Sequence, residues 1–292
     1  MEFDIMTPSI KKVVFPVGGL GKRFYPATIA IPKEMLPIVD RPLIDYAIEE
    51  ARLSGIEELI FVTRKGKSSI EDYIEEYIKN NNLKTKSNVI SDNNKVKELS
   101  FSFTRQQESL GLGHAIWCAR NLIRDEPFAV ILPDELFVSR TPCLHQLLKV
   151  YEDQAGYVLG LGEIPIEQSS NYGIVSFSND NGAVVKIDGM VEKPLPKNAP
   201  SNLSIIGRYI LQPEIFKFLE SAKSSIGGEI QLTDTLAQLV NNKPFHGVRC
   251  KGERFDCGSK AGLIKANIVL GLERKELHDE VSDFIMNFKR KL

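Results

Sequence analysis

Short apolar runs alternate with stretches of helical spacing along the first half of the chain, and this alternation limits the possible folds more than any other feature. Residues 12–17 (KVVFPV) form an apolar run that ends at two glycines, and residues 59–63 form a second run. Residues 43–53 (LIDYAIEEARL) have helical spacing, and a further helix is expected near residues 69–78. Buried strands that alternate with helices are typical of a mainly parallel sheet covered on both faces. The sequence therefore predicts an α/β fold.

Beyond residue 100 the chain continues these elements and then departs from the rhythm. Strands are expected at FSFTRQ, at PFAVILPDE and at residues 156–161, with helices near residues 113–122 and 142–154 between them. Shorter β-like pieces follow (YGIVSFS, AVVKIDGMVEKP and IIGRYIL), and the turn-like SNDNG between the first two indicates a hairpin. Further helices are expected at residues 213–222, 233–240, 260–270 and 276–291. Because there is no internal repeat or linker, we interpret residues 1–292 as one domain with a small antiparallel β insertion after the parallel half.

The most polar stretch of the chain is residues 79–100, which are rich in Asn, Ser and Lys. Such a composition cannot bury enough apolar surface to join a core. We predict that these residues form an exposed excursion.

The charges are balanced, with 37 Lys and Arg against 38 Asp and Glu, so the net charge is −1. A general nucleic-acid binder would show a basic excess, so nucleic acid is not an expected partner. No apolar run approaches the ~20 residues of a membrane span, and the first residues lack the pattern of a signal peptide. We therefore expect a cytoplasmic protein without a membrane partner. The four cysteines form no CxxC pair and do not have the spacing of a zinc site.

A glycine-rich loop follows the first predicted strand directly. Gly18, Gly19 and Gly21 permit close approach of the backbone, so their N–H groups can surround phosphate oxygens. Arg23 and Lys33 add positive charge suited to a triphosphate. The loop lacks the GxxxxGK[ST] of a P-loop and the third glycine of a dinucleotide fingerprint. We interpret it as a phosphate-binding loop, and the alternative is a plain tight turn.

Two carboxylates occupy positions that suit a metal ion. Asp134 ends the strand VILPDE, and Asp256 stands far away in the sequence, in RFDCG. Mg²⁺ is bound in proteins by one or two carboxylates together with phosphate oxygens. The alternative for Asp134 is a residue that forms a turn or caps a helix.

The motif MVEKP places a Glu–Lys pair at the end of a predicted strand. Glu192 could accept hydrogen bonds from sugar hydroxyls, and Lys193 could neutralise a phosphate. Surface charges of this kind more often have no function, which is the competing interpretation.

Eight motifs appear in order across residues 12–270: GGLGKRFYPATIAIPKEMLP, RQQESLGLGHA, ILPDE, NYGIV, VEKP, NLSIIGRYIL, GGEIQLTD and FDCG. Together they resemble the bacterial UTP–glucose-1-phosphate uridylyltransferases, within the wider sugar-1-phosphate nucleotidyltransferases. The resemblance implies a Rossmann-like mixed, mainly parallel sheet flanked by helices. It also implies a homodimer or homotetramer, with UTP and glucose 1-phosphate as substrates and Mg²⁺ as cofactor. The nucleotide-binding half would span about residues 12–140, the sugar-phosphate half about 141–270, and C-terminal helices would occupy 260–292.

The resemblance also implies roles for individual residues. The nucleotide would be lined by Gly18, Gly19 and Gly21, with Arg23 and Lys33 on its triphosphate. The uracil edge would be read by Glu34, Gln106 and Gly111. Mg²⁺ would be held by Asp134 and Asp256. Glucose 1-phosphate would be held by Gly173, Glu192, Lys193 and Glu229.

The implied reaction brings two anions together, and the charges of Arg23, Lys33, Lys193 and Mg²⁺ would offset their repulsion. The attacking phosphate is already ionised at neutral pH, so no general base is required. His114 is therefore interpreted as a structural residue at a helix start.

Three residues depart from the family pattern, Lys22, Ile29 and Leu110. Two alternative functions remain open at this point. One is a related transferase that uses dTTP or another sugar phosphate, although Glu34 favours uracil. The other is a weakly active regulatory homologue, to which Lys22 in the glycine loop draws attention.

Overall fold

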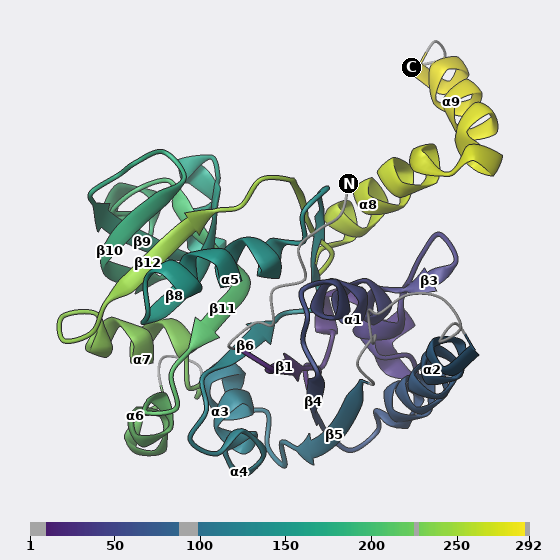
Figure 1. The fold of residues 1–292 in the computed structure, drawn as a ribbon. Coiled ribbons are helices and arrows are strands. Elements are labelled where there is room, and N and C mark those ends of the chain that lie inside the picture. Colours follow the sequence, from purple (N-terminus) through teal and green to yellow (C-terminus); the bar gives the residue numbers. More distant parts are fainter. Residues whose placement is uncertain (1–9, 88–98, 225–227, 290–292) are drawn as a thin grey trace.

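The computed structural model describes residues 10–87, 99–224 and 228–289 of the 292-residue chain. Within these residues, one nine-stranded sheet crosses the molecule in the order β5-β4-β1-β6-β11-β8-β12-β10-β9 (Figure 1). Its strands in chain order are β1 (Lys12–Pro16), β4 (Glu58–Thr63), β5 (Ser100–Arg105), β6 (Phe128–Ile131), β8 (Tyr157–Glu163), β9 (Gly173–Ser178), β10 (Val184–Glu192), β11 (Leu203–Leu211) and β12 (Phe245–Arg249).

The sheet is mixed. β5, β4, β1 and β6 run parallel, β11 reverses the direction beside β6, and β12 is again parallel to β8. β9 and β10 pair antiparallel, as the hairpin prediction requires, but β10 also pairs with β12. The predicted α/β class is therefore confirmed. The predicted antiparallel strands β9 and β10 lie at one edge of this same sheet.

Helices cover both faces of the sheet. They are α1 (Leu43–Leu53), α2 (Ser68–Ser87), α3 (Gly111–Cys118), α4 (Arg120–Ile123), α5 (Cys143–Asp153), α6 (Ile215–Ser221) and α7 (Leu232–Leu239). Alternate residues of β1 point to opposite faces, as the period of a strand requires. Val14 joins a core cluster with residues of α3, α6 and α7, whereas Val13 and Phe15 join a cluster with residues of α1, α2 and α5.

Helix α2 corrects one expectation from the sequence. Residues 79–87 continue the helix to Ser87 instead of leaving it as an exposed excursion. The helix is anchored by Ile70, Ile74 and Ile78, which repeat every four residues and are buried. Residues 88–98 of the predicted excursion lie outside the described part of the chain.

Two short ladders and several single turns complete the fold. The ladders pair β2 (Pro37–Ile38) with β3 (Arg41–Pro42), and β7 (Glu135–Val138) with β13 (Glu253–Asp256). The turns are the 3₁₀ helices η1 (Lys22–Phe24), η2 (Ala27–Ile29), η3 (Lys33–Met35), η4 (Ile166–Asn171) and η5 (Pro196–Asn198).

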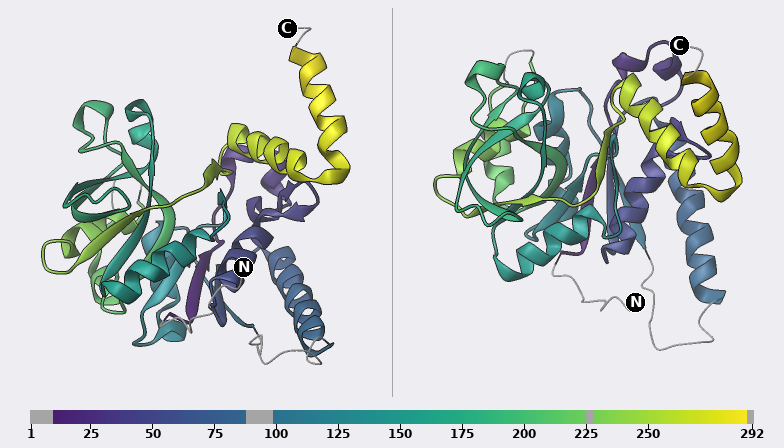
Figure 2. Two further views of the ribbon diagram at one scale, coloured as in Figure 1. Left: turned by 45° about the horizontal axis from the view of Figure 1, so that its top comes forward. Right: turned by 90° about the horizontal axis from the view of Figure 1, so that it is seen from above.

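The C-terminal helices α8 (Lys260–Glu273) and α9 (Lys275–Lys289) form an arm, and α9 projects away from the body of the molecule (Figures 1 and 2). α8 begins shortly after β13 ends. Ser259 caps its first turn by accepting a hydrogen bond from the N–H of Gly262 at 3.0 Å. Its first turn rests on the backbone of Asp256. A Cβ atom at Gly262 would lie 1.9 Å from the Asp256 carbonyl oxygen. Among the described residues, no helix has both the length and the apolar character that would let it span a membrane.

Candidate active site

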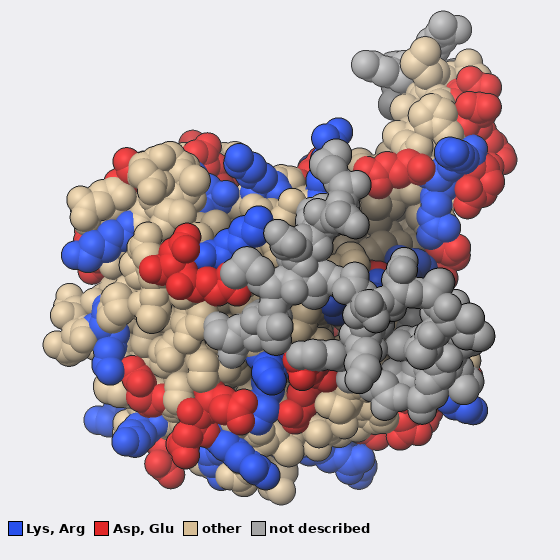
Figure 3. Space-filling model, viewed as in Figure 1, with Lys and Arg blue, Asp and Glu red and all other residues tan. Residues whose placement is uncertain are grey.

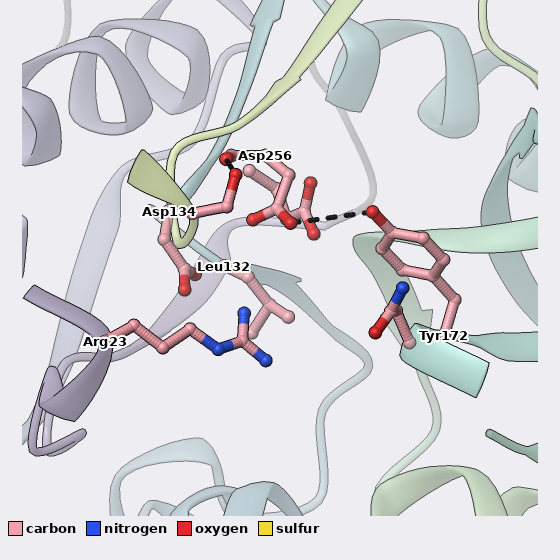
Figure 4. Close-up of a pocket in the computed structure, with 8 residues that line it drawn as sticks. Arg23, Leu132, Asp134, Tyr172 and Asp256 are labelled. Atoms are coloured by element: carbon pink, nitrogen blue, oxygen red, sulfur yellow. Dashed lines mark hydrogen bonds between the residues drawn. The ribbon is translucent and has the colours of Figure 1, made fainter. Parts of the chain in front are cut away.

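A cavity of about 700 Å³ opens over the carboxyl ends of β1 and β6. This is the edge of an open α/β sheet where ligands bind. Segments far apart in the sequence line it: the loop after β1, the start of α3, the end of β6, the end of β10 and residues 229–233 before and within α7. A smaller hollow of about 480 Å³ shares several of these residues. Figure 4 shows Arg23 and Tyr172 on opposite sides of that hollow, with Asp134 and Asp256 between them.

The glycine loop lines this cavity. A Cβ atom at Gly18 would lie 3.0 Å from Oε1 of Gln106, so a side chain would crowd the amide that faces the loop. Gly21 has a φ of 65°, in the left-handed region that glycine adopts without strain. Its carbonyl accepts a hydrogen bond of 2.7 Å from the hydroxyl of Thr28. The loop is therefore fixed in a form that leaves its backbone open toward the cavity.

Lys33 and Asp134 form an ion pair at the floor of the cavity. Nζ of Lys33 lies 2.5 Å from Oδ2 of Asp134. Burial alone would lower the pKa of Lys33, but the charges of Asp134 and Glu34 outweigh it and raise this pKa. Burial alone would raise the pKa of Asp134, but the charge of Lys33 outweighs it and lowers this pKa. Both groups are therefore ionised at neutral pH.

The structure does not bring the side chain of Glu34 into the cavity. Glu34 is 0% exposed, and its Oε2 accepts a hydrogen bond of 2.6 Å from Nζ of Lys67. Burial raises the pKa of Glu34 despite the two neighbouring lysines. The side chain of Glu34 therefore lies against Lys67 and is not among the residues that line the cavity. Its role in reading the base stays a prediction.

Glu34→Gln is expected to lower the free energy of unfolding by about 3 kcal/mol, because it leaves the ammonium of Lys67 buried without a counter-ion. Urea denaturation followed by circular dichroism measures this loss. The double variant Glu34→Gln, Lys67→Met removes both charges and should recover most of it. Equal stability of the Glu34→Gln variant and the wild type would contradict the assignment of this ion pair.

A short ladder brings Asp134 and Asp256 together. β13 pairs antiparallel with β7, and Asp256 lies opposite Glu135, the residue that follows Asp134. Arg254 clamps Glu135 with two hydrogen bonds of 2.7 and 2.9 Å. The N–H of Cys257 also donates to the carbonyl of Asp134 at 2.8 Å. The pairing of the two strands therefore sets the positions of both carboxylates.

The space above Gly258 suits a divalent cation. A Cβ atom at Gly258 would lie 3.0 Å from Oδ2 of Asp134 and 3.0 Å from Oδ1 of Asp256, so glycine keeps a gap that both carboxylates face. Within the described residues, no cluster of three or more His, Cys, Asp or Glu is placed to hold a metal. In nucleotide sites Mg²⁺ is bound by one or two carboxylates, and phosphate oxygens of the ligand complete its coordination. The residues present therefore fit such an ion.

The sugar-side residues from the sequence reach the same cavity from β9, β10 and the segment before α7. Gly173, Glu192, Lys193 and Glu229 all line it. Lys193 has a φ of 48°, a conformation that costs energy for a residue with a side chain and that clusters at functional sites. Its N–H donates to the carbonyl of Tyr172 at 3.0 Å, which holds it in that conformation. A Cβ atom at Gly173 would lie 2.9 Å from Oγ1 of Thr233, so glycine is needed there for close packing.

Gln106 lies beside Gly18 of the glycine loop, and Gly111 packs against Glu229 and Ile230. Both line the cavity, and Gln106 is only 6% exposed. The side-chain amide of Gln106 donates to the carbonyl of Gly111 at 3.1 Å. The two residues expected to read a base are therefore bonded to each other.

Some residues of the site were not assigned from the sequence. Tyr172 lines the cavity, and its hydroxyl lies 3.5 Å from Oδ2 of Asp256. Asn171 and Thr233 line the cavity as well. The motif NYGIV contains Asn171 and Tyr172, so it could have signalled both. Thr233 lies in the motif GGEIQLTD, which could have signalled it, and it reaches the site from the first turn of α7.

The three departures from the family pattern lie in different surroundings. Lys22 is exposed and lines the cavity, where its charge would favour a phosphate. Ile29 is 74% exposed. The carbonyl of Leu110 accepts a hydrogen bond of 2.6 Å from the N–H of Ile230, so Leu110 contributes to the site through its backbone.

Comparisons with known proteins agree with this geometry. The family model for nucleotidyl transferases matches residues 12–270. The UTP–glucose-1-phosphate uridylyltransferase of Komagataeibacter xylinus is 46% identical over 265 residues, which cover 89% of this chain and 93% of that protein. That of Bacillus subtilis (strain 168) is 43% identical over 280 residues, which cover 94% of this chain and 96% of that protein.

Solved structures match over the same extent. A UDP-glucose pyrophosphorylase complexed with UDP-glucose superposes with a TM-score of 0.82 at 42% identity, covering 91% of this chain and 100% of that one. A UTP-bound UGPase from Acinetobacter baumannii superposes with a TM-score of 0.81 at 37% identity, covering 95% of this chain and 99% of that one. The chain belongs to the nucleotidyl transferase family, among the bacterial UTP–glucose-1-phosphate uridylyltransferases.

Proposed function

We propose that the protein transfers a uridylyl group from UTP to glucose 1-phosphate, producing UDP-glucose and pyrophosphate. One observation supports this most strongly. A single cavity is lined by the glycine loop and Arg23 at one side and by Glu192 and Lys193 at the other, with Asp134 at its floor. An arrangement with cationic groups at two ends and a carboxylate between them suits two phosphate-bearing reactants that must meet.

In the proposed reaction, a phosphate oxygen of glucose 1-phosphate attacks the α-phosphorus of UTP in line. The bond from that phosphorus to the bridging oxygen breaks, and pyrophosphate leaves with the electron pair. Arg23 and Lys33 bind the triphosphate, and Lys193 binds the phosphate of the sugar. Their charges offset the repulsion between the two anions while the cavity fixes the geometry. No general base is needed, because the nucleophile is already an anion.

We assign Mg²⁺ as the cofactor and Asp134 and Asp256 as the residues that hold it. Bound there, the ion would supply positive charge to the phosphate oxygens of the nucleotide. Lys33, which bonds Asp134 in this structure, would then turn toward the triphosphate. In this scheme residues 12–140 bind the nucleotide and residues 141–270 bind the sugar phosphate, within one domain.

A turnover assay tests the proposal. Purified protein is mixed with Mg²⁺ and a panel of nucleoside triphosphates and sugar 1-phosphates, and release of pyrophosphate is measured. The highest kcat/KM is expected for UTP with glucose 1-phosphate. A higher value with dTTP would overturn the nucleotide assignment. Tight binding of UTP without any turnover would overturn the assignment as an active enzyme.

We also propose that the chain forms a homo-oligomer, a dimer or a tetramer, through its C-terminal arm. Large apolar side chains are exposed on this arm: Ile264 and Ile268 on α8, and Phe284, Ile285, Met286 and Phe288 on α9. Acidic side chains gather along one side of the projecting helix (Figure 3). A helix that stands away from its own core can bury such an apolar face only against another molecule. A second copy supplies the same apolar face, as a two-fold contact requires.

The double variant Phe284→Glu, Phe288→Glu is expected to convert the oligomer into a smaller species, because it places two charges in the proposed contact. Light scattering after size-exclusion chromatography measures the mass. Asn287→Glu, which adds a charge beside these residues on the polar side of α9, is the control and should leave the mass unchanged. A monomeric wild type, or an unchanged mass in the double variant, would contradict this assignment.

A further inference from the structure

His114 lies outside the cavity but bonds a residue that lines it. Gln106 is buried beside Gly18, and its Nε2 lies 3.1 Å from Nδ1 of His114. The same Nε2 donates to the carbonyl of Gly111 at 3.1 Å. His114 therefore reaches the site only through the side chain of Gln106.

The two contacts determine which way the amide of Gln106 faces. The carbonyl of Gly111 can only accept a hydrogen bond, so the NH₂ group of Gln106 must lie on that side. The second hydrogen of this group meets His114, whose Nδ1 must then be an acceptor. The proton of the neutral ring lies on Nε2, which faces Sγ of Cys118 at 3.9 Å. Two acceptors thus hold the NH₂ end of the amide.

The imidazole is itself held in place. His114 belongs to α3, and its ring stacks on that of Trp117, with centroids 5.9 Å apart and planes 19° apart. The guanidinium of Arg120 lies over the same indole, 3.4 Å from its centroid. The ring that orients Gln106 is therefore fixed by contacts within α3 and at the start of α4.

This arrangement leaves Oε1 of Gln106 on the side of Gly18, where a Cβ atom would lie 3.0 Å from it. An acceptor at this position distinguishes pyrimidines by their N3 atom. Uracil carries an N3–H donor, whereas N3 of cytosine is an acceptor that would meet Oε1 with its lone pair. To accept cytosine, the amide would have to turn and present Oε1 to both Gly111 and His114.

We propose that His114 is a positioning residue that fixes the amide of Gln106 as a hydrogen-bond acceptor and thereby makes the site select uracil over cytosine. The inference rests on the proposed function and on the base-reading role that the family resemblance implies for Gln106. It goes beyond the interpretation of His114 as a purely structural residue. A structural role and a positioning role predict different results when the acceptor is removed without a change in side-chain shape.

His114→Leu and His114→Asn form a matched pair, because leucine and asparagine have nearly the same size and branching. Asparagine can place an oxygen acceptor close to where Nδ1 lies, and leucine cannot. We expect His114→Leu to lower the preference for UTP over CTP about tenfold, the effect of one hydrogen bond that no longer opposes rotation of the amide. His114→Asn should retain most of the preference, and both variants should keep the wild-type KM for glucose 1-phosphate.

Two measurements read the preference: the ratio of kcat/KM for UTP and CTP, and the ratio of their affinities by calorimetry without the sugar phosphate. A tenfold loss in His114→Leu with rescue in His114→Asn would support the inference. An unchanged ratio in His114→Leu, an equal loss in both variants, or a wild type without preference would overturn it. Binding is measured without turnover. A wild type that binds UTP but does not react would therefore overturn only the proposed function, and the affinity ratios would still decide the role of His114.

Discussion

Asp134→Asn is expected to lower kcat by at least about a hundredfold, the size of effect seen when one group that stabilises charge in a transition state is removed. The amide has nearly the shape of the carboxylate but no charge, so it is a weaker ligand for a divalent cation. It also leaves Lys33, now 2.5 Å from Asp134, without its partner. Pyrophosphate release measured over a range of Mg²⁺ concentrations should show that the residual activity needs more Mg²⁺.

Asp125→Asn is a suitable control, because it makes the same chemical change at an exposed position between α4 and β6. It should leave both kcat and the dependence on Mg²⁺ unchanged. If Asp134→Asn retained near-normal activity at low Mg²⁺, the assignment of Asp134 as a metal ligand would have to be abandoned. Circular dichroism of the variant checks that the fold persists.

Lys193→Ala should raise the KM for glucose 1-phosphate about ten- to a hundredfold, the effect of losing a charge-assisted hydrogen bond to a phosphate. The affinity for UTP should change far less, because Lys193 follows β10 at the sugar side of the cavity, whereas the glycine loop follows β1. Initial-rate kinetics with each substrate varied in turn separate the two effects. Alanine keeps a Cβ atom, so the substitution should change the energy of the backbone conformation with φ of 48° only slightly.

The nearby Lys197 provides the matched control, since it is exposed, lies in η5 and does not line the cavity. Lys197→Ala removes the same charge four positions along the chain and should leave both KM values as they are. Equal losses of affinity for UTP and for glucose 1-phosphate in the Lys193→Ala variant would contradict the role given to Lys193.

The fold could be predicted where a signal is local. Residues 43–53 carry a complete helical pattern after a proline, and α1 has those same bounds. The hairpin of β9 and β10 is marked by the turn residues between the two strands. The extension of α2 to Ser87 was missed, because polar residues are typical both of loops and of the solvent-exposed face of a helix.

Two parts of the site could not be predicted from local patterns, because they depend on pairing between distant segments. β7 (ELFV) and β13 (ERFD) are short and lack the continuous apolar run that marks β6, and yet their pairing brings Asp134 and Asp256 together. The side chain of Glu34 was the other case. A family motif gives its position in the sequence, but only the packing of η3 against Lys67 shows that its carboxylate faces away from the cavity.

The roles of the individual site residues remain predictions, but their clustering is a property of the fold. Of the residues expected to hold the nucleotide and the sugar phosphate, all but Glu34 line one cavity. His114 illustrates the limit of reading residues one at a time. The sequence argument concerned only a direct catalytic role for His114. The contact between His114 and Gln106 depends on the fold, which places α3 beside the residue that follows β5.

The seating of α8 on the backbone of Asp256 connects the C-terminal arm directly to the proposed metal site. The 14 residues of α8 extend roughly 20 Å at a rise of about 1.5 Å per residue, and α9 continues from its far end. The first turn of α8 has no room to shift against the Asp256 carbonyl, where even a methyl group at Gly262 would collide. A neighbouring subunit bound to α9 would restrain α8 through the turn at Arg274, and with it the backbone of Asp256, so that assembly and reaction rate would be linked.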